Sequence, residues 1–442
     1  MHRRTTALFA LSATLLALPA ASQQGKTPPV NLYIDVLTHD MAGMPDMGGM
    51  LGGLGGLGGF MARRMGGAEQ GRPTYPTTRS GGLTGQYLDM ALLNTLKPGV
   101  AVEDQIPAGL QLGKSLTLVP FEPSTSGKDT SSPGKVPDVE VRISEYWGCG
   151  AGIRPGQPKV ATFKVKGGDK PIDPKNPMAG MQGIAVEASG SLSQGLYAPD
   201  RDIDLKPGYV YWPNRQYGKQ VPSGARLAGQ HRISGDGIPA SMQFQVEQSA
   251  DFMPRLALRT QGGLDQAIAL EWPSVERARA YFITAMHMQM LGERAFALTV
   301  WSSADVPGAG SQLHTYLGGG TVDKWLKQKV LLPASTTSCS IPQGIFAGAS
   351  NLQGQQMTMP AMLMMTAYGP ESWITYPPRP ADPKQAWNPE WSVRLRTRST
   401  ATAMLGLDFG GMPRMDGGED GQPPQQKKPS VKGLLKGLLG GG

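Results

Sequence analysis

The segment WSVRLRTR, residues 391–398, alternates large apolar side chains with arginines. The apolar residues share one parity along the chain, and the arginines share the other. Successive side chains of a β-strand point to opposite faces, so this pattern predicts a strand with one buried and one solvated face. The same period of two occurs in SMQFQVEQ (residues 241–248) and in DVEVRIS (residues 138–144).

Many short segments of this kind are separated by glycine and proline, whereas long helical stripes are scarce. The best helix candidate is DKWLKQKVL, residues 323–331. Short, regularly punctuated strands are typical of β-sandwiches. We therefore expect a mainly β protein with two β-sandwich domains, residues 83–251 and 252–410.

Both ends of the chain have a different composition. Residues 23–82 form a leader rich in glycine, methionine and leucine with a candidate strand at 30–38, and residues 411–442 form a glycine- and proline-rich tail. High glycine content raises the entropy cost of ordering, so we expect disordered ends. The tail carries a short amphipathic tip that could instead contact the envelope surface or another envelope protein, formed by Leu434, Leu435, Leu438 and Leu439.

The N-terminus indicates export. Residues 1–22 combine a basic start, an apolar run and a small-residue cleavage pattern, as signal peptides do. No later segment is apolar enough to cross a membrane, so we expect no transmembrane helix in the mature chain. The 42 basic and 34 acidic residues are scattered, which argues against a nucleic-acid partner. The expected location is the periplasm or the extracellular space, with at most peripheral attachment to the envelope.

The segment QAIALEWPSVERARAYFITA (residues 266–285), followed by FALTVWSS (296–303), resembles the B, C and C′ strands of fibronectin type III domains. The resemblance extends over about residues 250–375 and implies that the second sandwich is fibronectin III-like. In it, Trp272 would face Tyr281 across a turn. Because this fold hosts many functions, the resemblance implies no particular activity.

The chain has two cysteines, Cys149 and Cys339. The strand parity of their neighbours points both side chains inward, together with Trp147, so that Trp147, Trp272 and Tyr281 are candidates for a structural aromatic core. An oxidising compartment favours a disulfide, which would stabilise the fold by about 4–5 kcal/mol on a chain-entropy model. Two separate buried thiols, or one reactive thiol, remain as alternatives.

No catalytic residue can be nominated, since neither an HExxH nor a GxSxG pattern is present. The leader does resemble the methionine-rich segments of bacterial periplasmic copper-resistance proteins, in which thioethers bind Cu(I) or Ag(I). The residues that carry this resemblance are His39, Met41, Met44, Met47 and Met50. The same spacing continues with leucines, so a glycine-rich repeat of interchangeable apolar residues is the competing interpretation. The later methionines, in residues 286–290 and 357–365, mostly alternate as strand-core residues would.

We therefore expect an exported, non-catalytic envelope protein with a binding or structural role, an unknown ligand and no cofactor. The alternative is a periplasmic Cu(I)- or Ag(I)-binding protein that uses the methionine-rich leader. A third possibility is a β-sandwich hydrolase whose catalytic acids lie on loops and leave no local motif.

Overall fold

The computed structural model describes residues 27–43, 73–79, 81–123, 138–167, 185–348, 350–352, 355–357, 359–382 and 384–407. These residues are mainly β, as the period-two segments predict. In chain order, the elements are β1 (Val30–Met41), β2 (Gly85–Asn94), β3 (Val102–Gln105), η2 (Ala108–Leu110), β4 (Ser115–Pro120), β5 (Val139–Trp147), β6 (Lys159–Lys166), β7 (Ala185–Gly190), β8 (Tyr209–Trp212), β9 (Gly229–Ser234), β10 (Gln243–Val246), η3 (Gln248–Ala250), β11 (Arg259–Gln261), β12 (Ile268–Glu271), β13 (Ala280–Gly292), β14 (Ala295–Ser302), η4 (Ser311–Leu313), α3 (Gly319–Lys327), β15 (Leu332–Pro333), β16 (Ser338–Ile341), β17 (Ser350–Leu352), β18 (Gln355–Met357), β19 (Ala361–Tyr376) and β20 (Trp391–Leu405).

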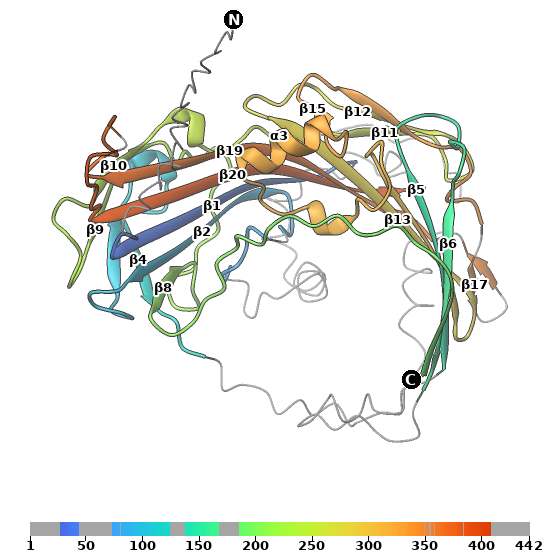
Figure 1. The fold of residues 1–442 in the computed structure, drawn as a ribbon, viewed down its shortest axis with the longest axis horizontal. Helices are drawn as coiled ribbons and strands as arrows, with labels where there is room; N and C mark the ends of the chain where they lie inside the picture. The colour runs from blue at the N-terminus through green and yellow to red at the C-terminus, as the bar shows by residue number, and fades with distance from the viewer. Residues whose placement is uncertain are drawn as a thin grey trace, which may run out of the picture. The chain divides into compact units, whose positions relative to one another are not determined.

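Most of the strands form one large mixed sheet. Its order is β10-β9-β3-β4-β8-β2-β1-β20-β19-β13-β14-β5-β6-β7, with β15 paired to β13. Strands β11, β12 and β16 form a second, three-stranded sheet, and β17 pairs with β18. The long strands β2, β1, β20 and β19 lie side by side in the middle of the large sheet (Figure 1).

Strand β1 is a central strand although the chain around it is rich in glycine. It pairs antiparallel with β2 over residues 30–39 and parallel with β20 along its whole length. Val30, Leu32, Ile34 and Val36 are each 0% exposed, because they point into a core that both neighbours share. The candidate strand at residues 30–38 thus lies within a longer strand that the sheet is built around.

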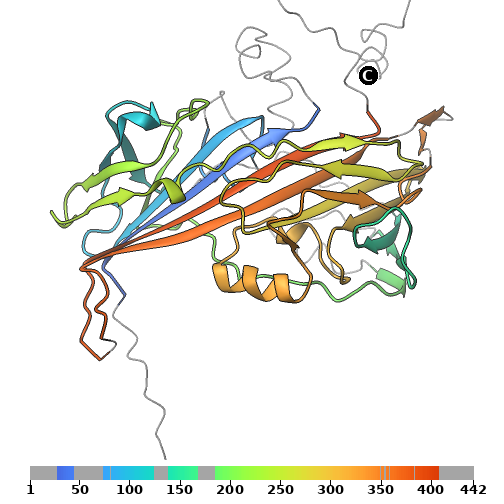
Figure 2. The ribbon, with the colours of Figure 1, turned by 90° about the horizontal axis from the view of Figure 1, so that it is seen from above.

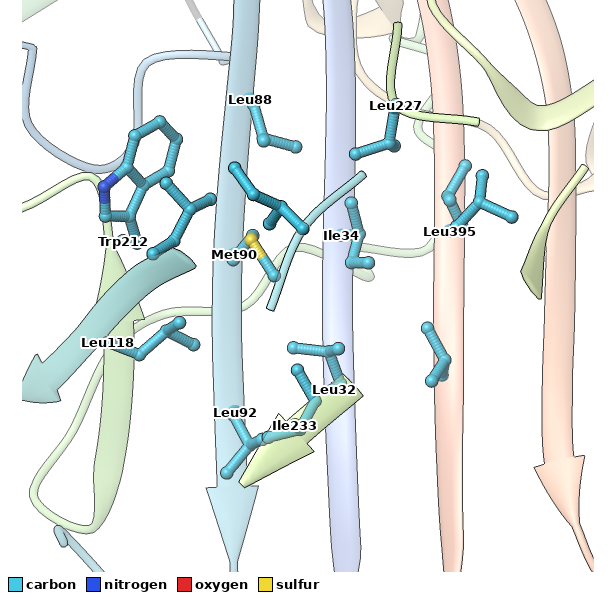
Figure 3. Packing of buried hydrophobic residues seen from close by; sticks show 14 of the residues in the cluster. Leu32, Ile34, Leu88, Met90, Leu92, Leu118, Trp212, Leu227, Ile233 and Leu395 are labelled. Carbon is cyan, nitrogen blue, oxygen red and sulfur yellow. The ribbon is translucent and has the colours of Figure 1, made fainter. Parts of the chain in front are cut away.

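A first hydrophobic core lies on one face of these central strands. Leu32, Ile34 and Leu395 of β1 and β20 pack in one cluster with Leu118 of β4 and Ile233 of β9 (Figure 3). Strands β3, β4, β9 and β10 continue the sheet beyond β8. Because their side chains reach the same cluster as β1 and β20, this part of the sheet curves back over the central strands.

A second core lies between the two sheets, which pack face to face. Leu270 of β12 is in one cluster with Ile283 of β13 and Leu363 of β19. The neighbouring residue Phe282 points to the other face, where it packs in a third cluster with Trp325 of α3. Figure 2 shows α3 on one side of the long strands β19 and β20 and the yellow-green strands of the small sheet on the other.

The change from the first core to the second falls at residues 252 and 253 along the chain, but β20 contributes to both clusters. One sheet therefore runs through the two regions that the sequence assigns to separate domains. The division at residues 251 and 252, and the number of domains, stay predictions.

The helix expected at residues 323–331 corresponds to α3, which begins and ends four residues earlier than that segment. Val330 and Leu331 therefore lie in the turn after the helix, where they are buried.

Candidate functional site

One face of β20 carries three arginines, Arg394, Arg396 and Arg398, which we call the arginine ladder. Alternation along the strand predicts that this face is solvated. That expectation was wrong, because the three residues are 4%, 2% and 1% exposed. Segments from elsewhere in the chain cover them: Arg394 donates to the carbonyl of Arg201, and Arg398 to that of His314.

Among the described residues, Arg396 is the member of the ladder that is paired with carboxylates. Its Nε and Nη2 donate to the two carboxylate oxygens of Asp35 on β1 at 2.7 and 2.6 Å, and Nη2 also donates to Asp202 at 2.9 Å. Burial opposes the charge, but the carboxylates of Asp35 and Asp202 outweigh it and raise the pKa of Arg396. The group is a buried, charged ion pair that joins β20 to β1 and to the covering segment.

The other two arginines are held mainly by carbonyl groups and aromatic rings. The guanidinium of Arg398 lies 4.5 Å from the ring of Tyr316, and that of Arg394 lies 4.8 Å from the ring of Tyr33. Burial, together with the charge of Arg396, lowers the pKa of Arg394. Such cation–π contacts stabilise desolvated guanidinium groups. The ladder therefore binds the covering segments to the sheet through hydrogen bonds and ring contacts. Its guanidinium groups are buried and not exposed to a ligand.

Further along β20 the same face becomes neutral and polar. His314 shares hydrogen bonds with Thr284 and Thr366, both at 2.8 Å, and His39 shares one with Thr400 at 2.8 Å. Burial lowers the pKa of His314 to about 3 and that of His39 to about 4, and the charge of the last arginine of the ladder adds to both effects. Both imidazoles are neutral at pH 7 and belong to the packed interior.

The candidate copper ligands of the leader are only partly described. His39 lies on β1 and is 2% exposed, and Met41 ends that strand half-buried. Met44, Met47 and Met50 lie outside the described residues. Within the described part of the chain, no cluster of three or more His, Cys, Asp and Glu side chains is placed to hold a metal ion.

The two cysteines lie together. The structure joins Cys149, in the loop after β5, to Cys339 of β16 by a disulfide with Cα atoms 5.2 Å apart. Beside it, the amide of Gly150 donates to the carbonyl of Ser340 at 2.9 Å. The bond thus links the region of β5 in the large sheet to the three-stranded sheet, across the second core.

The expected aromatic residues occupy different environments. Trp272 and Tyr281 are 3% and 0% exposed and pack edge to face, with ring centroids 5.6 Å apart. The hydroxyl of Tyr281 accepts a hydrogen bond from the amide of Val275 at 3.0 Å, which fixes the turn between β12 and β13. Trp147, at the end of β5, is half-buried, and its backbone is bonded by the side-chain amide of Gln157.

At the far end of β20, the face of the ladder ends in exposed methionines. Met286 on β13 pairs with Met362 on β19, and Met362 pairs with Met404 on β20. These three residues, which we call the methionine row, are 45%, 52% and 36% exposed. The expectation that the later methionines are core residues was wrong for Met286, Met288 and Met362, because the cluster around α3 covers this face only as far as Phe282.

The signal-like residues 1–22 and the four leucines of the tail lie outside the described residues. Within the described ranges, no helix is long and apolar enough to cross a membrane. No family model matches the chain, and neither a curated protein nor a solved structure is significantly similar to it.

Proposed function

We propose that this protein is an exported, non-catalytic component of the cell envelope with a binding or structural role, in the periplasm or outside the cell. The observation that carries the proposal is the burial of the reactive side chains on the ladder face. Its arginines and histidines are bonded within the fold and are closed to solvent. Catalytic groups need access to a substrate, so these groups support a structural protein better than an enzyme.

We also propose that residues 252–410 form a fibronectin III-like sandwich domain. The three-stranded sheet β11-β12-β16 packs face to face on β13 and β19 of the large sheet, which is the layered arrangement of such domains. The edge-to-face contact of Trp272 with Tyr281 supports the same proposal. A sandwich of this kind is a rigid scaffold for binding surfaces rather than evidence for one activity.

The open end of the ladder face is the binding surface in this proposal. Met286, Met288 and Met362 are between 45% and 52% exposed there. Exposed apolar patches on proteins mark interaction sites, and methionine adapts to irregular partners. The expected partner is an apolar surface of another envelope component, which would hold the protein at the envelope.

Fractionation of cells that produce the protein tests this role. The parent should sediment with the envelope, whereas the double variant Met286→Asp and Met362→Asp should be released in soluble form with an unchanged melting temperature. Leu96→Asp is the matched control, since Leu96 is 58% exposed in the turn after β2, at the opposite end of the central strands. A soluble parent, or a double variant that stays with the envelope, would contradict the proposal.

A second candidate function is Cu(I) or Ag(I) binding by the methionine-rich leader. The observation in its favour is the position of Met41, which pairs with Thr402, two residues from Met404. The leader therefore departs from the sheet close to exposed thioethers. Replacing Met41, Met44, Met47 and Met50 by leucine should weaken Cu(I) binding sharply while the fold is unchanged.

A further inference from the structure

Three methionines lie in register on three adjacent strands of the large sheet. Met362 of β19 is directly opposite Met286 of β13 on one side and Met404 of β20 on the other. Directly opposed residues of neighbouring strands have Cβ atoms about 4.5–5.5 Å apart. The methionine row therefore places three thioether side chains next to one another, from strands whose backbone is fixed by the sheet.

All three side chains leave the sheet on the same face. Their chain neighbours Ala285, Leu363 and Ala403 are buried in the second core, and side chains alternate along a strand, so the row points to the opposite side. It is 36–52% exposed there, which leaves the sulfur atoms within reach of an ion from solvent. A methionine side chain has three rotatable bonds, so the three sulfurs can converge without a change in the backbone.

Neighbouring positions add further sulfur. Met364, two residues from Met362 on the same face of β19, is half-buried beside the row. Met288, two residues from Met286 on β13, is 51% exposed. A purely hydrophobic surface could be formed by any apolar residue. This end of the face instead consists mainly of methionine, whose thioether sulfur is a soft donor atom.

We propose that Met286, Met362 and Met404 form a binding site for a soft monovalent cation, Cu(I) or Ag(I). Thioethers are neutral, polarizable ligands that select Cu(I) over hard cations. The site differs from the leader segment and does not depend on the envelope role. Binding requires no change in oxidation state: each sulfur donates a lone pair to an ion that arrives as Cu(I) or Ag(I).

Competition for Cu(I) between the full-length protein and the chromophoric chelator bicinchoninate tests the site under anaerobic conditions. The parent should withdraw Cu(I) from the chelator, and the triple leucine variant at Met286, Met362 and Met404 should bind it at least about tenfold more weakly, because even outer-shell changes around a metal alter affinity by about 10- to 100-fold. The single variant Met362→Leu, which removes the central ligand, should show a loss in the same direction. Leucine keeps the apolar surface and nearly the same volume, so envelope retention should not change.

Two controls separate this site from other sources of sulfur. Met365→Leu replaces a methionine that is 0% exposed on the opposite face of β19, and its Cu(I) affinity should equal that of the parent. The leucine variant of the four leader methionines should retain one Cu(I) held by the row. X-ray absorption of that variant loaded with Cu(I) should show a first shell of sulfur alone. The proposal is overturned if the parent does not bind, if the triple variant and Met362→Leu bind as the parent does, or if the first shell contains nitrogen or oxygen only.

Discussion

At the scale of single residues, the clearest prediction concerns Arg396. Removing one partner of a buried ion pair leaves the other charge buried and unpaired, which costs about 3–5 kcal/mol. The change Arg396→Met would leave Asp35, 8% exposed, without its bidentate partner. We therefore expect the free energy of unfolding, measured by urea denaturation, to fall by that amount.

The double variant Arg396→Met with Asp35→Leu should recover most of this loss, because no unpaired charge then remains on β1. The control is the surface pair Arg279–Asp323, whose side chains are 36% and 58% exposed. Exposed pairs contribute about 0–1 kcal/mol, so Arg279→Met should hardly alter stability. Equal effects of Arg396→Met and Arg279→Met would show that the ladder is not the buried structure described above.

His314 gives a pH prediction whose sign follows from its pKa. In the folded protein burial lowers the pKa of His314 to about 3, whereas an unfolded chain titrates near its usual value of about 6.5. Between these values the unfolded state binds more protons, so this residue's contribution is complete above pH 6.5 and declines as the pH falls. The destabilisation caused by His314→Asn should therefore shrink as the pH falls from 6.5 to 5, with a slope that approaches about 1.4 kcal/mol per pH unit near pH 5.

His231 supplies the control with the opposite sign. Burial lowers its pKa, but the hydrogen bond and charge of Asp104, whose Oδ2 lies 3.0 Å from Nδ1, outweigh burial and raise the pKa. Its contribution is complete below pH 6.5 and is lost as the pH rises through the folded pKa. The destabilisation caused by His231→Asn should thus grow as the pH falls from 8.5 to 6.5. Urea denaturation from pH 5 to 8.5 checks both signs. A difference in the free energy of unfolding between parent and variant that does not change with pH would contradict the assignment.

At the scale of elements, the sequence predicted where strands form better than it predicted which of their faces are buried. The alternation in residues 241–248 corresponds to β10, in which Phe244 and Val246 are buried and Gln243 and Gln245 are exposed. In β20 the same pattern predicted the strand but not the burial of its arginines. Alternation indicates which face is more polar. Whether that face meets water is decided by covering segments that are distant along the chain, such as those of Arg201, 193 residues from Arg394, and His314, 84 residues from Arg398.

The order of the strands in the sheet could not be predicted from local sequence signals either. The parallel pairing of β1 with β20 joins residues 361 positions apart, as in the hydrogen bond from Ser392 to Asn31. The methionine row depends on two further strand pairings, β13 with β19 and β19 with β20, so it could not be found from the spacing of methionines along the chain. The motifs MHMQM and MTMPAMLMM were visible, but only the register shows which of their sulfurs meet.

The disulfide between the loop after β5 and β16 gives a prediction about how elements are held together. Cys149 and Cys339 are 190 residues apart, and closing so long a loop lowers the entropy of the unfolded chain. The protein denatured without reductant should show no free thiol. The variant Cys149→Ala with Cys339→Ala should lose about 4–5 kcal/mol in free energy of unfolding. Two titratable thiols per chain would mean that the cysteines are separate buried residues.

At the scale of the whole molecule, the ladder, the polar histidines and the methionine row follow one another along a single sheet face. Arg394 to Arg398 lie under covering segments, Thr400 lies beside a buried histidine, and Met404 is exposed. One strand, β20, therefore anchors the fold at one end and carries the proposed binding surface at the other. This arrangement requires β1, because β1 supplies Asp35 and His39 and separates β20 from β2.

The position of β1 predicts which shortened chains fold. By composition alone, residues 83–410 would be expected to contain both sandwiches, with the leader dispensable. Yet β1 buries Val30, Leu32, Ile34 and Val36 completely. Burying one such side chain contributes about 1.5–3 kcal/mol, and four together are comparable with a typical net stability of about 5–15 kcal/mol.

We therefore expect a chain of residues 27–407 to unfold cooperatively at nearly the melting temperature of residues 23–442, whereas residues 83–407 should lose cooperative unfolding. Circular dichroism and calorimetry on both chains measure this difference. The shorter chain also leaves β2 and β20 with unpaired edges in the middle of the sheet, which favours aggregation. If residues 83–407 melted like residues 23–442, β1 could not be the strand that joins the two halves of the sheet, and Arg396 would not depend on its ion pair with Asp35.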